Sequence, residues 1–263
     1  MKNYFLMGCF CLLLPACMGG EARQEEQAAD TLADTQWLQG VWLDDNTESP
    51  VFKIKGDSIY YASQINAPLK YDLKNDTLTI YGVETVHYLL ERCQEQALQF
   101  RTPVGDMVSL HKSDNDSAFV ALSVTGPEKK EVISKDLAVM YQGKRYRGYV
   151  YINPTSIKVV RPSLTEEGLT MDNVYYDNVI HICVYQGKQR LYAKDITRQM
   201  FSSVVPDDYL KMSILSDMDF IGVDAEGYHY LATLCIPDGA SCYNVEFTID
   251  RDDQLSFSSA DVE

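Results

Sequence analysis

Residues 68–92, PLKYDLKNDTLTIYGVETVHYLLER, decide the fold class of the first half of the chain. Short runs of alternating apolar and polar residues follow one another here, and the triplet Lys74-Asn75-Asp76 separates two of them. An alternation with a period of two is typical of strands that bury one face, and the triplet is typical of a tight hairpin turn. The stretch therefore predicts consecutive antiparallel strands.

The same pattern covers residues 36–112, where Lys55-Gly56-Asp57 and Pro103-Val104-Gly105 are further turn signals. It predicts eight strands, at residues 38–44, 51–55, 58–63, 68–73, 77–81, 86–92, 97–101 and 105–111. So many short strands in so few residues cannot form two large sheets. We therefore expect a strongly curved antiparallel meander or a small barrel.

WLQGVWLDDN (37–46) stands before the first strands, and GDSIYY (56–61) and NDTLTIYG (75–82) lie on successive hairpins. In these stretches the region resembles the lipocalin-like domains of lipoproteins from Bacteroidetes-type anaerobes. The resemblance implies a barrel of eight strands. Lipocalin strands are about twice as long and enclose a ligand cavity, so no ligand-binding residue is carried over. Trp37 and Trp42 are expected to pack in the core or across a barrel end.

Residues 113–128 are expected to connect two domains and could donate a strand. The second domain, residues 129–263, again reads as β structure, with longer strands. The tetrapeptide Tyr-Gln-Gly-Lys occurs at 141–144 and at 185–188, each time between two strand-like runs, and predicts two hairpin turns. Strand-like runs are found at 138–153, 157–161, 176–194, 210–224, 228–239 and 241–257.

One helix is predicted within residues 195–212, with Thr197 as its N-cap and Pro206 at its end. Long strands on both sides of one short helix favour a β-sandwich. The fold class is thus mainly β: a small lipocalin-like antiparallel meander or barrel followed by a β-sandwich-like domain with one short helix.

Two stretches of the second half form a pattern, YYDNVIHICVYQGKQRLYAKDITRQMF (175–201) and CIPDGASCYNVEFTIDRDDQLSF (235–257). With them the second half is similar to an uncharacterised Bacteroidetes-type lipoprotein family, a domain of unknown function. The similarity implies architecture and compartment, and it implies no activity.

The N-terminus reads as a targeting segment, because Lys2 precedes an apolar run that is too short to span a membrane. Leu14, Pro15, Ala16 and Cys17 resemble the lipobox of bacterial lipoproteins, in which the cysteine becomes the lipidated N-terminus. We expect residues 1–17 to be a signal peptide ending at Cys17 and residues 18–35 to be a flexible, acidic tether. The protein is then exported and held on a membrane, expected to be the outer membrane.

Four cysteines follow this segment. Cys235 and Cys242 flank a Pro-Asp-Gly turn and are expected on one face of a hairpin, either as a disulfide or as a pair of free thiols. Cys93 and Cys183 are expected to stay unpaired. The four histidines are scattered singly, so neither a metal site nor a cofactor is expected.

A formal net charge of −15, spread along the chain, argues against nucleic acid as a partner. The one basic cluster, Lys144, Arg145 and Arg147, reads as a solvated strand face. Four of the 18 tyrosines, at 60, 61, 175 and 176, occur as adjacent pairs. Tyr60, Tyr61, Tyr175 and Tyr176 are candidates for a contact surface for a glycan or a protein, although tyrosine is also a good strand residue.

The sequence holds no nucleophile elbow, zinc-protease motif or phosphate-binding loop. Its acidic pairs read as turns rather than as facing catalytic carboxylates. We therefore expect a non-enzyme that binds or scaffolds at the cell envelope. A small-ligand carrier using the first domain is the second hypothesis, and a hydrolase with an unrecognised site is the third.

Overall fold

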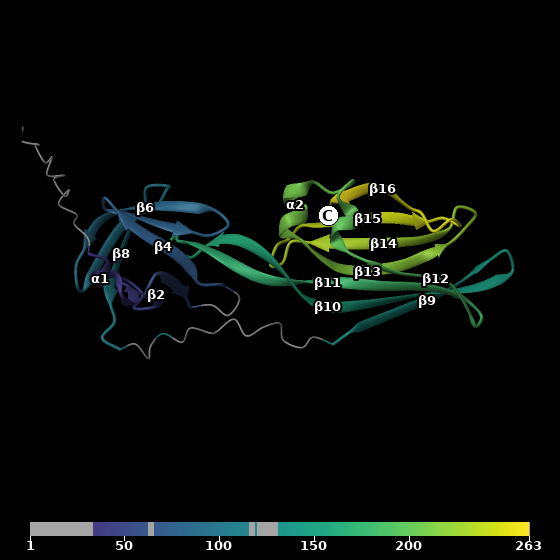
Figure 1. Ribbon diagram of the computed structural model, residues 1–263, viewed down its shortest axis with the longest axis horizontal. Coiled ribbons are helices and arrows are strands. Elements are labelled where there is room, and N and C mark those ends of the chain that lie inside the picture. Colours follow the sequence, from purple (N-terminus) through teal and green to yellow (C-terminus); the bar gives the residue numbers. More distant parts are fainter. Residues whose placement is uncertain (1–33, 63–65, 116–118, 120–130, 263) are drawn as a thin grey trace, which may run out of the picture. The chain divides into compact units, whose positions relative to one another are not determined.

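The protein, seen in a computed structural model, is mainly β, with a closed barrel followed by two antiparallel sheets (Figure 1). The structure describes residues 34–62, 66–115, 119 and 131–262. The expected signal peptide with Cys17, nearly all of the expected tether and most of the expected connection at 113–128 lie outside these residues. Among the helices within the described residues, none is long and apolar enough to cross a membrane.

Eight strands form the barrel in sequence order, and β1 pairs with β8 to close it. The strands are β1 (Gly40–Asp44), β2 (Pro50–Lys55), β3 (Ser58–Tyr61), β4 (Leu69–Lys74), β5 (Thr77–Tyr81), β6 (Thr85–Cys93), β7 (Ala97–Arg101) and β8 (Met107–Lys112). The expected small barrel is confirmed. Asn75 and Asp76 both have positive φ between the paired residues Lys74 and Thr77, which is the backbone of a two-residue hairpin turn.

A single helical turn, α1 (Thr35–Leu38), covers one end of the barrel. Leu38 is fully buried, and its carbonyl accepts a hydrogen bond of 2.8 Å from the indole nitrogen of Trp42. Trp42 is also fully buried, as expected of a residue that packs at a barrel end. Trp37 differs, because its side chain is 40% exposed. The first strand begins at Gly40 rather than at residue 38, since α1 occupies the residues before it.

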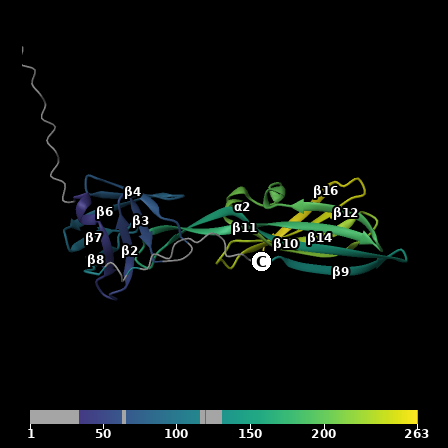
Figure 2. The same cartoon turned by 60° about the horizontal axis from the view of Figure 1, so that its bottom comes forward.

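Two four-stranded sheets make up the second half (Figures 1 and 2). One has the order β12-β11-β10-β9, and the other has the order β13-β14-β15-β16. Apolar residues from both sheets form one buried cluster, which includes Val150 and Ile182 of the first sheet and Phe247 of the second. The strands are β9 (Ile133–Tyr141), β10 (Lys144–Leu164), β11 (Thr170–Gln186), β12 (Gln189–Ile196), β13 (Ile214–Val223), β14 (Tyr228–Cys235), β15 (Cys242–Ile249) and β16 (Leu255–Val262).

Two short helices replace the single predicted one. A 3-10 turn, η2 (Arg198–Phe201), begins after Thr197, and α2 (Asp207–Met212) begins after Pro206. Pro206 therefore precedes a helix instead of ending one, which proline tolerates because the first helical N–H groups have no intrahelical partner. The buried Arg198 forms an ion pair of 3.0 Å with Asp177 and donates a 2.7 Å hydrogen bond to the carbonyl of Ser213. This ion pair fixes the helical segment to the first sheet.

The β10–β11 hairpin extends beyond β9 and β12, the two strands that flank it in the first sheet. β9 pairs with β10 only as far as Ile152, and β12 pairs with β11 only from Ile180 onward. The remainder, residues 153–164 and 170–179, is a two-stranded ribbon that we call the arm. The sequence predicted two separate strands at 138–153 and 157–161, whereas β10 runs through both with an irregularity between Pro154 and Lys158.

The turn of the arm, residues 165–169, closes the second end of the barrel. Leu169 is 1% exposed and belongs to the buried cluster of the barrel. Tyr61 donates a 2.7 Å hydrogen bond to the carbonyl of Thr170. Tyr88 accepts a 2.7 Å bond from the Thr170 amide and donates one of 3.3 Å to the carbonyl of Gly168. The arm therefore supplies both apolar contacts and polar partners to the barrel.

Candidate functional site

The four tyrosines proposed from the sequence as a contact surface do not form one. Tyr61 is 3% exposed, because it points into the barrel and its hydroxyl bonds to the arm, so the expectation of a surface role is wrong for this residue. Tyr60 is half-buried on β3. Tyr175 and Tyr176 are half-buried neighbours on β11, where adjacent side chains point to opposite faces. Tyr175 donates a 2.7 Å hydrogen bond to Asp238.

A different set of aromatic side chains lies together on the outer face of β10 and β11. Along β10, Val150 and Ile152 point into the core between the sheets, so Tyr149 and Tyr151 point outward. Their ring centroids are 6.2 Å apart and their planes differ by only 6°. Tyr185 of β11 meets Tyr149 edge to face, with the centroids 5.7 Å apart. Three tyrosines thus form one cluster.

Arginines flank these rings. Arg145 and Arg147 lie on the same face of β10, and Arg190 of β12 is directly opposite Tyr185. The guanidinium of Arg147 lies 5.1 Å from the centre of the Tyr149 ring and forms a 2.5 Å ion pair with Asp136. That pairing holds the pKa of Asp136 below its ordinary value. We call the set Arg145, Arg147, Tyr149, Tyr151, Tyr185 and Arg190 the tyrosine–arginine face.

The tyrosine–arginine face is hollowed. A depression of about 420 Å³ is lined by Arg145, Arg147, Tyr149, Tyr151, Tyr185 and Gly187. β10 packs tightly against β13 of the second sheet, because Gly148 lies so close to Phe220 that an added Cβ would come within 2.2 Å of its ring. The packing of the two sheets therefore holds the outward side chains in register. Such an arrangement can stack a flat ligand and bind an anionic group.

The sequence contains part of the signal for this face. Its basic cluster reads as a solvated strand face, and the alternation in RYRGYVY (145–151) places Arg145, Arg147, Tyr149 and Tyr151 on one side of a strand. Tyr185 and Arg190 could not be added from the sequence, because their positions depend on the pairing register of β10, β11 and β12.

A larger hollow of about 1090 Å³ lies between the barrel rim and the turn of the arm. Its acidic residues include Asp44, whose carboxylate accepts hydrogen bonds from the amides of Asn46 and Thr47 and so serves a turn. Glu166 and Glu167 lie in the turn of the arm. Within the part of the chain that the structure describes, no group of three or more His, Cys, Asp or Glu side chains could hold a metal ion.

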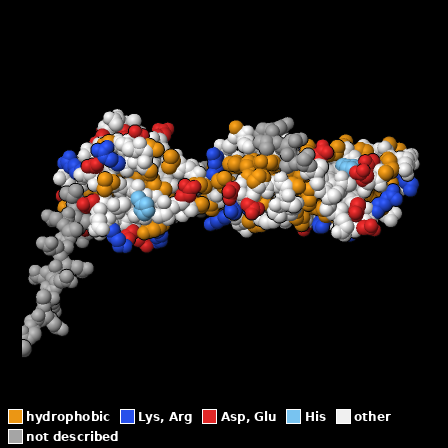
Figure 3. All heavy atoms as spheres, turned by 90° about the horizontal axis from the view of Figure 1, so that it is seen from above, with side chains coloured by type: hydrophobic (Ala, Val, Ile, Leu, Met, Phe, Trp, Pro, Cys, Tyr) orange, Lys and Arg blue, Asp and Glu red, His pale blue; other side chains and the backbone are white. Residues whose placement is uncertain are grey.

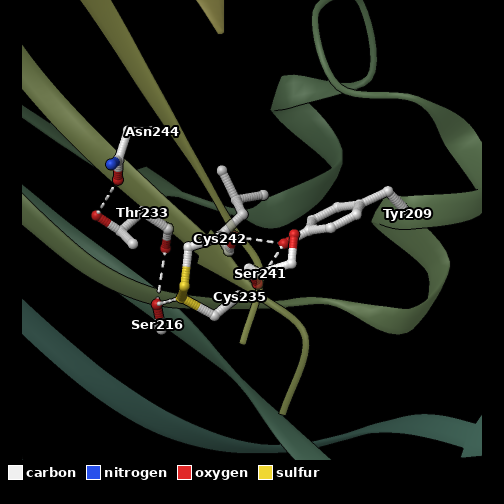
Figure 4. The surroundings of a disulfide bond; sticks show 8 residues. Tyr209, Ser216, Thr233, Cys235, Ser241, Cys242 and Asn244 are labelled. Atoms are coloured by element: carbon white, nitrogen blue, oxygen red, sulfur yellow. Dashed lines mark hydrogen bonds between the residues drawn. A yellow bond between two sulfur atoms is a disulfide. The ribbon is translucent and has the colours of Figure 1, made fainter. Parts of the chain in front are cut away.

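The cysteines of the described regions form one disulfide and two buried thiols. Cys235 and Cys242 are directly opposite on β14 and β15, with Cα atoms 4.2 Å apart, and form a disulfide (Figure 4). The Ser216 hydroxyl lies 3.0 Å from the Thr233 carbonyl oxygen and 3.3 Å from the Cys235 sulfur, and its single proton can be donated to either acceptor. Cys93 and Cys183 are free and buried, as expected. Burial raises the pKa of Cys93 to about 11, which keeps it in the unreactive thiol form.

Asp172 is the one carboxylate of the arm that the barrel buries deeply. Its side chain accepts a 2.8 Å hydrogen bond from the Val83 amide, and its other oxygen is buried without a partner. Gly82 makes this approach possible, since a Cβ there would lie 3.0 Å from both carboxylate oxygens. Burial raises the pKa of Asp172, the Val83 bond opposes the rise, and the negative charge of Glu84 adds to it.

These features define a β-rich protein whose barrel is closed by a hairpin of the following sheets and whose outer sheet face has half-buried tyrosines flanked by exposed arginines. A family model described as "Domain of unknown function (DUF4738)" matches residues 112–257, more than half of the chain, and the protein belongs to this family. The match covers the arm, the tyrosine–arginine face and the disulfide, and it indicates no activity. A search of curated proteins finds no match.

We predict that Asp172→Asn raises the free energy of unfolding at neutral pH. Because the folded pKa of Asp172 lies above the unfolded one, the folded state binds more protons between these two values, and stability falls as pH rises through that window. The substituted asparagine side chain keeps an acceptor for the Val83 amide without a buried charge. Urea titrations from about pH 4 to about pH 7 would show a smaller decline for the variant than for the wild type.

The exposed Asp114 provides the control, and Asp114→Asn should leave the decline unchanged. Identical pH profiles for the wild type and Asp172→Asn would contradict the prediction that burying the charged Asp172 carboxylate lowers the free energy of unfolding.

Proposed function

We propose that this protein is exported, anchored to the cell envelope by a lipid on Cys17, and binds its partner without catalysis through the tyrosine–arginine face. The observation that carries the proposal is the set of three clustered tyrosine rings flanked by arginines on an exposed sheet face. Tyrosine and arginine are the residues most often responsible for binding energy at protein surfaces.

The rigidity of the face supports a binding role. Tyr149 and Tyr151 project from a strand held between β9 and β11, and Arg147 is held by Asp136. Side chains that are already ordered lose little conformational entropy when a ligand arrives. A preformed face of this kind favours recognition of a flat surface, such as a glycan or an exposed segment of an envelope protein.

The other two hypotheses have less support. A carrier needs an open interior, whereas large buried side chains, among them Trp42, Tyr88 and Phe100, pack inside the barrel together with Leu169 of the arm. A hydrolase needs converging catalytic groups. His111, His181 and His229 lie on different strands, and each is paired with its own local acid. Non-catalytic binding is therefore the function that the geometry supports best.

The anchor is tested by Cys17→Ala. The variant should lose metabolic labelling with fatty acid and should move from the membrane fraction to the soluble fraction, because a stable anchor needs the acyl chains that this cysteine would carry. Cys11→Ala, within the apolar run, should keep both properties. Labelling of Cys17→Ala at the wild-type level would refute the anchor.

The face is tested with full-length protein in detergent and sedimented envelope fragments of the producing cell. Tyr149→Ala combined with Tyr151→Ala should weaken binding about tenfold or more, since truncating an aromatic anchor costs more than about 1 kcal/mol and about 1.4 kcal/mol is a factor of ten. Tyr60→Ala, a half-buried tyrosine of the barrel, is the matched control. Equal binding by the double variant and the control would reject the face as the binding surface.

A further inference from the structure

The charge on the tyrosine–arginine face is opposite to that of the chain. The protein has a formal net charge of −15, and on the side drawn in Figure 3 acidic side chains are scattered among Lys and Arg. Around the three tyrosines the charged residues are Arg145, Arg147 and Arg190, together with Asp136, opposite Tyr149 on β9, and Asp195, which pairs with His181 beside Tyr151. Among the residues that the structure describes, Arg147 has a carboxylate partner in Asp136, while Arg145 and Arg190 form no ion pair.

The two Tyr-Gln-Gly-Lys turns add to this positive charge. They connect β9 to β10 and β11 to β12, as predicted, and β10 and β11 are antiparallel partners. Both turns therefore lie at the same end of the sheet, next to Arg145. Lys144 and Lys188 are exposed there and, within the described regions, form no ion pair. These lysines raise the positive charge at this end of the sheet, and Lys144 alternates with Arg145, so it starts on the other face of β10.

The geometry of the rings points to sugars. The rings of Tyr149 and Tyr151 are stacked on each other with their centres 6.2 Å apart, and the Arg147 guanidinium lies over the Tyr149 ring, so a ligand meets ring edges, hydroxyls and guanidinium groups. The tyrosine hydroxyls and arginine N–H groups suit the hydroxyl groups of a sugar. Tyr185, edge-on to Tyr149, forms a side wall.

We propose that the tyrosine–arginine face binds a carboxylate-bearing saccharide, with the hydroxyls of Tyr149 and Tyr151 bonded to sugar hydroxyls and Arg145 paired with a sugar carboxylate. The planar fork of a guanidinium matches both oxygens of a carboxylate. A single-stranded nucleic acid would also use aromatic and cationic groups. The net charge of −15 and the proposed export favour a saccharide with isolated charges over a polyphosphate chain. The inference rests on the proposed function and specifies its ligand.

Oligogalacturonate and its methyl ester are matched probes, since they have the same sugar rings and differ in charge. Titration calorimetry with the full-length protein should show tighter binding of the acid form, by about tenfold, and the difference should shrink as salt is added. Arg145→Gln should bring the two affinities together without weakening binding of the ester. Lys158→Gln, an exposed cation on the arm, should leave the preference intact.

Equal binding of the two probes by the wild type would overturn the charge preference while leaving a role in sugar binding. Binding of neither probe, or tighter binding of a single-stranded oligonucleotide, would overturn the saccharide assignment. The proposed function itself would stand in these cases if Tyr149 and Tyr151 were still required for binding to envelope fragments. It would fail together with the inference if the double tyrosine variant bound those fragments as well as the wild type did.

Discussion

The insertion of the turn at 165–169 into the barrel is the contact on which the arrangement of the chain depends. A barrel of such short strands has too few residues to cover its own ends, and α1 with Trp42 covers only one of them. Leu169 fills the other, and burying a leucine side chain contributes about 1.5–3 kcal/mol. The hydroxyls of Tyr61 and Tyr88 pair with the backbone of the arm, so these buried polar groups do not carry an uncompensated desolvation cost. Asp172 opposes docking in part, because its buried carboxylate keeps one oxygen without a partner.

The two strands that form the arm also build the tyrosine–arginine face. Beyond the arm, β10 and β11 enter a four-stranded sheet, where alternate residues divide between the core and the outer surface. Val150 anchors β10 in the core and Tyr149 projects from its other side. The packing of Val150 between the two sheets therefore also fixes the strand from which Tyr149, a proposed ligand contact, projects. A family match that spans the arm and the face, but begins at the end of the barrel, agrees with this grouping.

The sequence predicts the barrel well because its evidence is local. Each short strand shows a period of two, and a turn signal such as Asn75-Asp76 follows at once. The arm was missed because the predicted runs end before Pro154 and before Pro162, and proline is unusual within a strand. Beyond Ile152, β10 pairs with β11 alone, and a strand with a free edge tolerates proline. Part of the tyrosine–arginine face could be predicted, because the alternation along β10 is a local pattern. The positions of Tyr185 and Arg190 could not, because they depend on strand partners far along the chain. Tyr61 was misassigned because adjacent tyrosines do not reveal which of them faces a core.

Closure of the barrel by the arm is tested most directly by Leu169→Ala, with unfolding in urea followed by tryptophan fluorescence. Both tryptophans, Trp37 and Trp42, lie at the start of the barrel, so this signal reports on the barrel although the mutation is in the following sheets. The structure predicts a loss of about 2–4 kcal/mol in the free energy of unfolding. Leu164→Ala, on the same hairpin with a side chain 66% exposed, should change it by no more than about 0.5 kcal/mol. A barrel transition that is equally insensitive to both substitutions would contradict the closure of the barrel by the arm.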